Sequence, residues 1–112
     1  MAQVNVIIAQ AGPLPVKATA EIMSDGPVVV TLAGSVWSTT ADQLIGIALL
    51  IDGEPTPIAA SIFSNRPTTH RAVVPAIAPY TFTIGEHTFE LQPSTSHTIS
   101  DYNDFFNLTV QY

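Results

Sequence analysis

The sequence predicts an all-β protein, built as an antiparallel β-sandwich. Nine prolines and six glycines are spread over its 112 residues, and no apolar pattern with the period of a helix runs between them. The segments between these breaks are rich in Val, Ile, Thr, Phe and Tyr, which are residues typical of strands. Eight or nine short strands, separated by turn residues, favour a sandwich or a jelly roll.

The chain is expected to form one domain over residues 1–112, because it is too short for two independent cores. Charged residues make up only 11% of it, against a usual share of about 25%. Residues 27–41 and 72–85 carry no charge at all. Such a surface must be covered by neutral polar side chains or be hidden against another copy of the chain.

The charge balance excludes several classes of partner. The net charge is −6, and the basic residues are Lys17, Arg66 and Arg71 alone. Nucleic-acid binding needs rows of cations to replace phosphate counterions, so neither nucleic acid nor an anionic membrane is an expected partner. Because there is no cysteine, disulfides and thiolate sites are absent and the compartment stays open.

No targeting or membrane-spanning segment is expected. The N-terminus has no basic region and too short an apolar run for a signal peptide. The longest apolar run, residues 44–51, has eight residues, far below the roughly 20 that span a bilayer. The sequence therefore predicts a soluble chain.

The first three predicted strands cover residues 3–10, 16–23 and 28–37. The second and third alternate between apolar and polar residues, as expected when one face lies in the core. Gly34 marks a bulge or a close approach of another segment. The predicted inward-facing residues are Val16, Ala18, Ala20, Ile22, Val28, Val30, Leu32 and Val36.

The middle of the chain has strands that are apolar on both faces, at residues 44–51, 58–63 and 72–77. Asp52-Gly53 between the first two predicts a tight hairpin. Strands with two apolar faces belong in the middle of an assembly. One small sandwich cannot cover both sides of three strands, so we expect burial against neighbouring subunits.

The C-terminal third returns to alternation. Each predicted strand there has one apolar face, and the faces are formed by Tyr80, Phe82 and Ile84, then by His87, Phe89 and Leu91, and finally by Phe106, Leu108 and Val110.

Catalysis is not expected. The three histidines, His70, His87 and His97, show no metal-ligand spacing. No nucleophile elbow, phosphate loop or His-Glu-x-x-His motif occurs. The apolar face mates of His87 favour a packed histidine over a metal ligand.

The loop at residues 64–71 is one candidate binding site. It holds Arg66, His70 and Arg71, and so concentrates the hydrogen-bond donors of a charge-poor chain, as recognition of a carboxylate or a hydroxylated ligand requires. A solvated hairpin loop explains the same residues, and for Arg71 an ion pair between subunits is a third interpretation.

The loop at residues 100–104 is the other candidate. Asp101, Asn103 and Asp104 offer oxygen atoms that calcium could use, although Asx-turns need the same residues without a metal. Tyr102 could stack on a sugar ring. Trp37 could do the same, or it could be an aromatic residue of the core.

Residues 80–91, with Gly85-Glu86-His87-Thr88 at a turn, and residues 101–110, with an aspartate-bearing loop before a last strand, resemble the ends of bacterial and phage-associated jelly-roll domains of the TNF/C1q-like type. The resemblance implies a jelly-roll topology and a homotrimer with apolar strands facing the three-fold axis. Several such domains are lectins or receptor-binding tips. No sugar-binding motif of a named lectin family maps onto this sequence, so the resemblance assigns no site residue.

The leading hypothesis is a trimeric binding module that recognises a glycan or a cell-surface receptor. An oligomer would multiply weak single sites through effective concentration. A shell, tail or decoration subunit, in which the apolar strands serve assembly alone, is the alternative, and a cupin-type enzyme with metal-binding histidines is the third. The predicted ligand-binding residues are Trp37, Arg66, His70, Arg71, Asp101, Tyr102 and Asn103.

Overall fold

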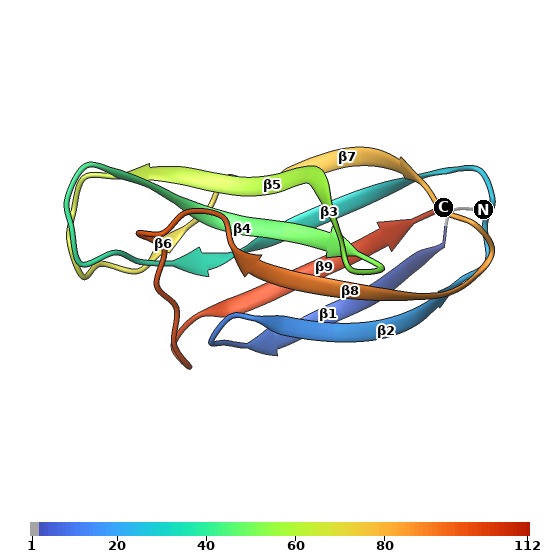
Figure 1. Cartoon of the computed structure of the whole chain (residues 1–112), viewed down its shortest axis with the longest axis horizontal. Helices are drawn as coiled ribbons and strands as arrows, with labels where there is room; N and C mark the ends of the chain where they lie inside the picture. Colours follow the sequence, from blue (N-terminus) through green and yellow to red (C-terminus); the bar gives the residue numbers. More distant parts are fainter. Residues whose placement is uncertain (1–2) are drawn as a thin grey trace.

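The computed structural model describes residues 3–112, which form two antiparallel β-sheets packed face to face (Figure 1). None of these residues belongs to a helix that could cross a membrane. The strands are β1 (Val4–Ala11), β2 (Val16–Ile22), β3 (Pro27–Val36), β4 (Gln43–Ile51), β5 (Glu54–Ser64), β6 (Arg71–Ala72), β7 (Ala76–Thr81), β8 (Gly85–Pro93) and β9 (Phe105–Gln111).

The strand order is that of a jelly roll. β1 pairs with β9, β2 with β8, β3 with β7 and β4 with β5. The chain is thus one long antiparallel ribbon, folded back at the β4–β5 hairpin, whose successive strand pairs fall alternately in the two sheets. Further pairing of β9 with β3 and of β8 with β4 rolls the ribbon up. This order confirms the predicted sandwich and jelly roll.

The first sheet contains β1, β9 and β3 in that order, with β6 and β7 both pairing with β3. The second sheet has the order β2-β8-β4-β5. β1 begins and β9 ends at the same end of the sandwich (Figure 1), where Gln3 and Tyr112 exchange two backbone hydrogen bonds.

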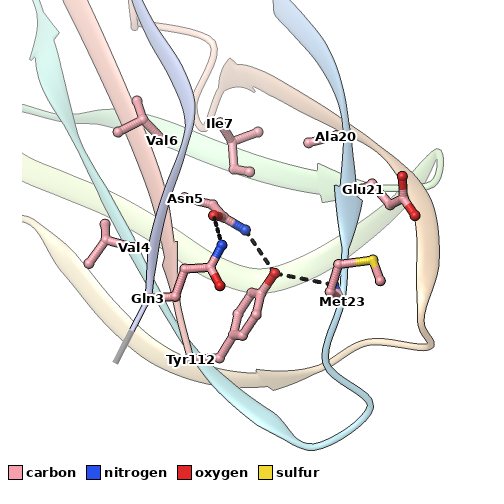
Figure 2. Close-up of a pocket in the computed structure, with 9 residues that line it drawn as sticks. All are labelled: Gln3, Val4, Asn5, Val6, Ile7, Ala20, Glu21, Met23 and Tyr112. Carbon is pink, nitrogen blue, oxygen red and sulfur yellow. Dashed lines mark hydrogen bonds between the residues drawn. The ribbon is translucent and has the colours of Figure 1, made fainter. Parts of the chain in front are cut away.

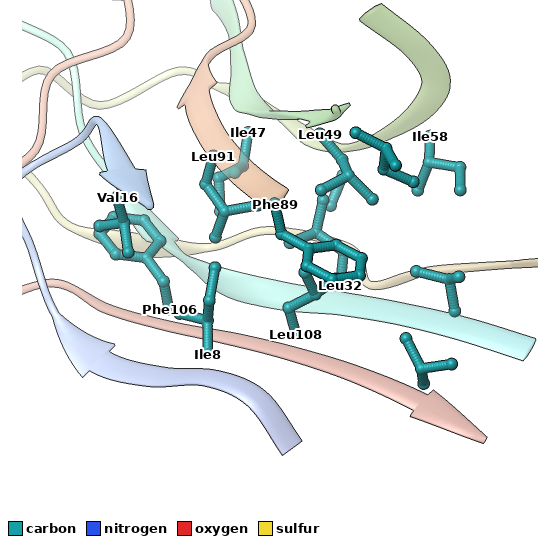
Figure 3. Close-up of a cluster of buried hydrophobic side chains, with 14 of the residues drawn as sticks. Ile8, Val16, Leu32, Ile47, Leu49, Ile58, Phe89, Leu91, Phe106 and Leu108 are labelled. Atoms are coloured by element: carbon teal, nitrogen blue, oxygen red, sulfur yellow. The ribbon is translucent and has the colours of Figure 1, made fainter. Parts of the chain in front are cut away.

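The core lies between the sheets and is almost entirely aliphatic and aromatic (Figure 3). The inward residues predicted for β3 are at most 1% exposed, and those predicted for β9 are completely buried. Alternation along a strand places these side chains on one face, as predicted. Ala18 and Ala20 of β2 also face inward but are only partly buried.

The position of β4 explains part of its two-sided apolar character. β4 lies inside the second sheet, between β8 and β5, and its inward residues Ile45, Ile47 and Leu49 are fully buried. On its outward face Leu44 is 52% exposed and lies opposite Phe63, which is 59% exposed. A single chain therefore leaves the outer apolar residues uncovered, and the expected burial against a subunit stays a prediction.

Gly34 lies at a close approach, one of the two interpretations given above. A Cβ built at this position would lie 2.8 Å from Ile47 Cδ1 and 2.8 Å from Phe106 Cδ1. A larger residue would push these two core side chains apart. The glycine therefore brings β3 close to the opposite sheet and to β9.

Two sequence-based expectations for residues 72–84 are wrong. The strand predicted at residues 72–77 is interrupted, because Val73 N donates to Gly34 O in one sheet while Val74 N donates to Ser61 O in the other. The second concerns Ile84, which is 56% exposed while Phe82 is buried. β7 ends at Thr81, so the alternation that would place Ile84 beside Phe82 ends with it.

His87 joins the β4–β5 hairpin to the loop before β8. Its Nδ1 lies 2.6 Å from Asp52 Oδ2, and its Nε2 lies 2.6 Å from the carbonyl oxygen of Thr83. Both partners accept, so each ring nitrogen carries a proton and the ring is an imidazolium. The hydrogen bond to Thr83, together with Asp52, raises the pKa of His87 against the opposing effect of burial. The hydrogen bond between His87 and Asp52 in turn lowers the pKa of Asp52.

Because Asp52 and Thr83 bond to the protonated ring of His87, we predict that the free energy of unfolding falls at alkaline pH. Because the folded pKa is raised, this contribution is complete below the unfolded value near 6.5 and is lost as the pH rises through the folded pKa. We expect His87→Gln to lower the free energy of unfolding by about 2–3 kcal/mol at pH 6 and by less at pH 9. Urea denaturation at both pH values measures this.

The control is His97→Gln, a substitution at an exposed histidine, which should change the free energy of unfolding little. An equal loss of stability at pH 6 and pH 9 in His87→Gln would contradict a charged His87.

Candidate functional site

One end of β3 brings together residues from three distant segments. β3 pairs with β6 through Val36 and Arg71, and with β9 through Gly34 and Phe106. His70 is the residue before β6, Asp104 is the residue before β9, and Trp37 is the residue after β3. The three therefore meet where neighbouring strands begin or end.

We call this group of residues the histidine cluster (Ser35, Trp37, His70, Asp101 and Asp104). Asp104 is buried at its centre. Its side chain is inaccessible to solvent. Oδ1 accepts from Ser35 Oγ at 2.7 Å and lies 2.7 Å from His70 Nδ1. Oδ2 accepts from the backbone N of Asp101 at 3.0 Å. A buried carboxylate needs such donors to offset its lost hydration.

His70 is held by one nitrogen and presents the other. With Nδ1 on Asp104, its Nε2 lies 3.7 Å from Asp101 Oδ2, which is longer than a hydrogen bond. The hydrogen bond to Asp104 raises the pKa of His70, and the charges of Asp104 and Asp101 act in the same direction, while burial opposes them. His70 thus offers a partly exposed, readily protonated nitrogen beside a partly exposed carboxylate.

The turn from Asp101 to Asp104 is tied down by its own hydrogen bonds. Asn103 N donates to Asp101 Oδ1 at 2.8 Å, which is the Asx-turn considered above, and Asp104 N donates to Asp101 O at 3.0 Å. Gly12 N donates to Asp104 O from the adjoining segment. On this fixed turn the side chain of Tyr102 is 80% exposed.

Trp37 is neither an open stacking surface nor part of the main core. Its ring is partly buried, and its centroid lies 5.6 Å from that of His70 at an interplanar angle of 39°. Among residues 3–112 its Nε1 is a buried donor without a hydrogen-bond partner, which is an unfavourable arrangement.

Among the described residues, the two arginines of the predicted site form no side-chain hydrogen bond with the histidine cluster. Arg66 is exposed in the loop between β5 and β6, and Arg71 is half-buried at the start of β6. Among the residues that the structure describes, neither forms a salt bridge. Of the seven predicted residues, the histidine cluster contains Trp37, His70 and Asp101, and its turn carries Tyr102 and Asn103.

The geometry of the histidine cluster suits binding better than nucleophilic catalysis. In a hydrolytic triad the serine would bond to the second imidazole nitrogen, whereas Ser35 bonds to the aspartate. Ligand atoms of His70, Asp101 and Asp104 lie within 4.8 Å of one another. Because both Asp104 oxygens already accept hydrogen bonds, mainly Nε2 of His70 and Oδ2 of Asp101 remain for a metal ion.

A second feature is a groove of about 410 Å³ between β1 and β2, at the opposite end of β3 from the cluster (Figure 2). Tyr112 lies between the two strands, and its Oη accepts from Asn5 Nδ2 at 2.8 Å and from Met23 N at 3.2 Å. Gln3 Nε2 donates to Asn5 Oδ1 at 3.1 Å. Sequence reasoning missed this groove, because Asn5 and Tyr112 lie 107 positions apart and carry no motif.

The comparisons with known proteins concern the fold. No family model matches this sequence, and no curated protein matches it. Solved structures with a similar fold include dimeric latent PorU from Porphyromonas gingivalis (TM-score 0.58, 7% identity, covering 98% of this chain). They also include an exo-β-1,3-galactanase from Phanerochaete chrysosporium crystallised with β-1,3-galactotriose (TM-score 0.51, 11% identity, 99% of this chain).

The chain spans only 12% of PorU and 26% of the galactanase. The sugar-binding C-terminal domain of EclA, with a TM-score of 0.49 and 14% identity, matches over 98% of this chain and 76% of its own length. At such low identities the likeness shows a β-sandwich and assigns no residue. No family model confirms the resemblance to TNF/C1q-like domains.

The network around Asp104 predicts a difference between the two aspartates. Asp104→Asn replaces an acceptor of three hydrogen bonds, so the free energy of unfolding should fall by about 2–4 kcal/mol. The pKa of His70, measured by NMR titration, should fall as well, because Asp104 is the main cause of its rise.

Asp101→Asn is the matched control. This carboxylate acts on His70 through charge alone and is partly exposed, so both effects should be smaller. A larger fall of the His70 pKa in Asp101→Asn than in Asp104→Asn would contradict the assigned hydrogen bond.

Proposed function

We propose that this domain binds glycans through the surface formed by Tyr102, Asp101 and His70. The observation that carries the proposal is the exposure of Tyr102 on a turn whose backbone is already fixed. Presenting an aromatic ring on a rigid turn avoids the entropy cost of ordering it on binding.

The polar atoms around Tyr102 suit hydroxyl groups. Asp101 Oδ2 can accept a hydrogen bond from a sugar hydroxyl, and His70 Nε2 can donate one when the ring is protonated. Tyr102 offers an aromatic face to the apolar side of a pyranose ring. One carboxylate, one imidazole and one ring together match a ligand that has both hydroxyl groups and an apolar face.

The fold allows this role. The galactanase that shares it was crystallised with β-1,3-galactotriose, and the EclA domain is described as sugar-binding. The choice of Tyr102, Asp101 and His70 comes from this chain alone. A glycan carried on a cell-surface receptor would present the same chemistry, and Trp37, Arg66, Arg71 and Asn103 remain predicted contributors at the same end.

The proposal predicts weaker glycan binding when the aromatic ring of Tyr102 is removed. On a glycan array the wild-type domain should give at least one oligosaccharide hit, and titration calorimetry should then give its affinity. Tyr102→Ala should weaken that affinity about two- to tenfold, the usual worth of an aromatic contact. Tyr102→Phe should keep it.

Phe63→Ala is the matched control, because Phe63 is an exposed aromatic residue of the other sheet. It should leave glycan binding unchanged. A folded wild-type protein without any array hit, or an affinity in Tyr102→Ala equal to that of wild type, would overturn the proposal.

The outer face of the first sheet supports self-association, the second part of the proposed function. Its four long strands, β1, β3, β7 and β9, contain no Asp, Glu, Lys or Arg. The residues exposed there include Val4, Val6, Val29, Ile77 and Phe105. The second sheet instead carries Lys17, Glu21, Glu86 and Glu90 on β2 and β8.

Two chains that each carry a net charge of −6 repel each other, and this repulsion is weakest when the two surfaces in contact carry no charge. We therefore place the expected trimer contact on the first sheet rather than on the middle strands of the second. A trimer would also present several Tyr102 surfaces at once and so raise avidity.

Sedimentation of the wild-type domain should give the mass of a trimer. Ile77→Glu should shift the mass toward the monomer, because it places a charge in the uncharged face, where Ile77 is 71% exposed. Leu44→Glu, a change of similar exposure on the second sheet, is the control and should leave the oligomer intact.

A monomer at all concentrations would contradict self-association. If Leu44→Glu dissociates the oligomer and Ile77→Glu does not, the contact lies on the second sheet instead. Large assemblies without any glycan binding would favour the alternative, a structural assembly subunit.

Calcium at Asp101, Asn103 and Asp104 also stays a proposal, which calorimetric titration of the metal-free domain with calcium tests.

A further inference from the structure

The long strands at the sheet edges differ in how they are protected against pairing with another chain. Natural edge strands are commonly blocked by charges, prolines or bulges. Here β2 has Lys17 and Glu21, β5 has Pro55 and Pro57, and β7 has Pro79. β1 has neither a charged residue nor a proline, and its only protection is a register shift between Val6 and Ile8.

The backbone groups of β1 that face away from β9 can be identified from the hydrogen bonds at its start. Gln3 and Tyr112 exchange two backbone hydrogen bonds, one of them 2.9 Å from Tyr112 N to Gln3 O. In an antiparallel ladder such pairs alternate, so Asn5 and Val110 form the next one. The N–H and C=O groups of Val4 and Val6 therefore point to the open edge, and β9 is the only strand that pairs with β1 in the described chain.

The two residues that carry these groups, Val4 and Val6, are among those that line the groove described above (Figure 2). Packed sheets lie roughly 10 Å apart, about twice the ~4.8 Å between paired strands. A slot between the edge strands of two facing sheets thus has the width of one extended chain. Ile7, Ala20 and Met23 supply apolar contacts along it, while Gln3 Oε1 and the Tyr112 proton have no partner among the described residues.

We propose that the groove between β1 and β2 binds a short extended peptide, which pairs with the free edge of β1 at Val4 and Val6. The register shift after Val6 limits straight pairing to this short stretch, so a short segment fits better than the long strand of a second folded copy. The peptide is neutral or basic, because Glu21 has the only charged side chain among the described residues that line the groove and the chain carries a net charge of −6. This site is independent of the glycan surface at Tyr102.

The test uses a fluorescent peptide, Lys-Thr-Val-Thr-Val-Thr-Lys, titrated with the full chain by fluorescence anisotropy. The matched control peptide has the same sequence with every inner backbone nitrogen methylated, which removes strand pairing and keeps the side chains. We expect it to bind about tenfold more weakly or worse. A peptide with Glu in place of both Lys should bind several-fold more weakly.

Two protein variants complete the design. Val6→Pro removes one N–H of the free edge without removing a bond to β9, and should weaken peptide binding about fivefold or more. Val6→Thr is its control and should bind normally, and Tyr102→Ala should bind the peptide like wild type. If Val6→Pro fails to fold, as judged by circular dichroism, the methylated peptide decides alone.

Four results would overturn the proposal. They are no binding of the parent peptide, equal binding of the methylated peptide, equal binding by a folded Val6→Pro variant, and peptide-induced amide shifts confined to residues 101–104. A glycan that shifts the amides of Asn5 and Met23 while the peptide does not would assign the groove to sugars. Dimers that dissociate in Val6→Pro without any peptide binding would assign the edge to a second copy.

Discussion

Strand β3 is paired on both of its sides, and this pairing sets which segments of the chain become neighbours. β9 pairs along one side of β3, while β7 and then β6 pair along the other. Gly34 makes these contacts close, because its missing side chain leaves room for Phe106 and Ile47. At the end of β3 that follows Gly34, the residues that precede β6 and β9 meet, so Asp104 reaches both Ser35 and His70.

Scarcity of charge divides the surface into parts with different physical properties. The first sheet is uncharged along its four long strands, whereas the second carries charges on β2 and β8. The buried ionisable groups His87 and Asp104 have hydrogen-bond partners. His87 bonds to Asp52 and to the carbonyl oxygen of Thr83, and Asp104 accepts hydrogen bonds from three donors. The Tyr102 surface and the β1 edge lie at opposite ends of β3, so glycan binding and peptide binding can be tested one at a time.

Several predictions from the sequence are confirmed because they depend on local properties. Alternation with a period of two placed Val30, Leu32 and Leu108 in the core, and Asp52-Gly53 formed the predicted hairpin. The strand predicted over residues 72–77 was wrong, because there the chain passes from Gly34 of one sheet to Ser61 of the other. That crossing depends on partners far away in the sequence, so no local pattern shows it.

The order of residues alone predicts a β-sandwich with little charge, since strand period, turn residues and composition are properties of neighbouring residues. It also indicated His70, Asp101 and Tyr102 as candidates, but could not show that Asp104 joins His70 to Ser35. That contact forms when the chain folds, as does the groove at Asn5 and Tyr112, which lie 107 positions apart. The physical reason is that strand pairing in a jelly roll joins distant segments, and the geometry of a site follows from which strands become neighbours.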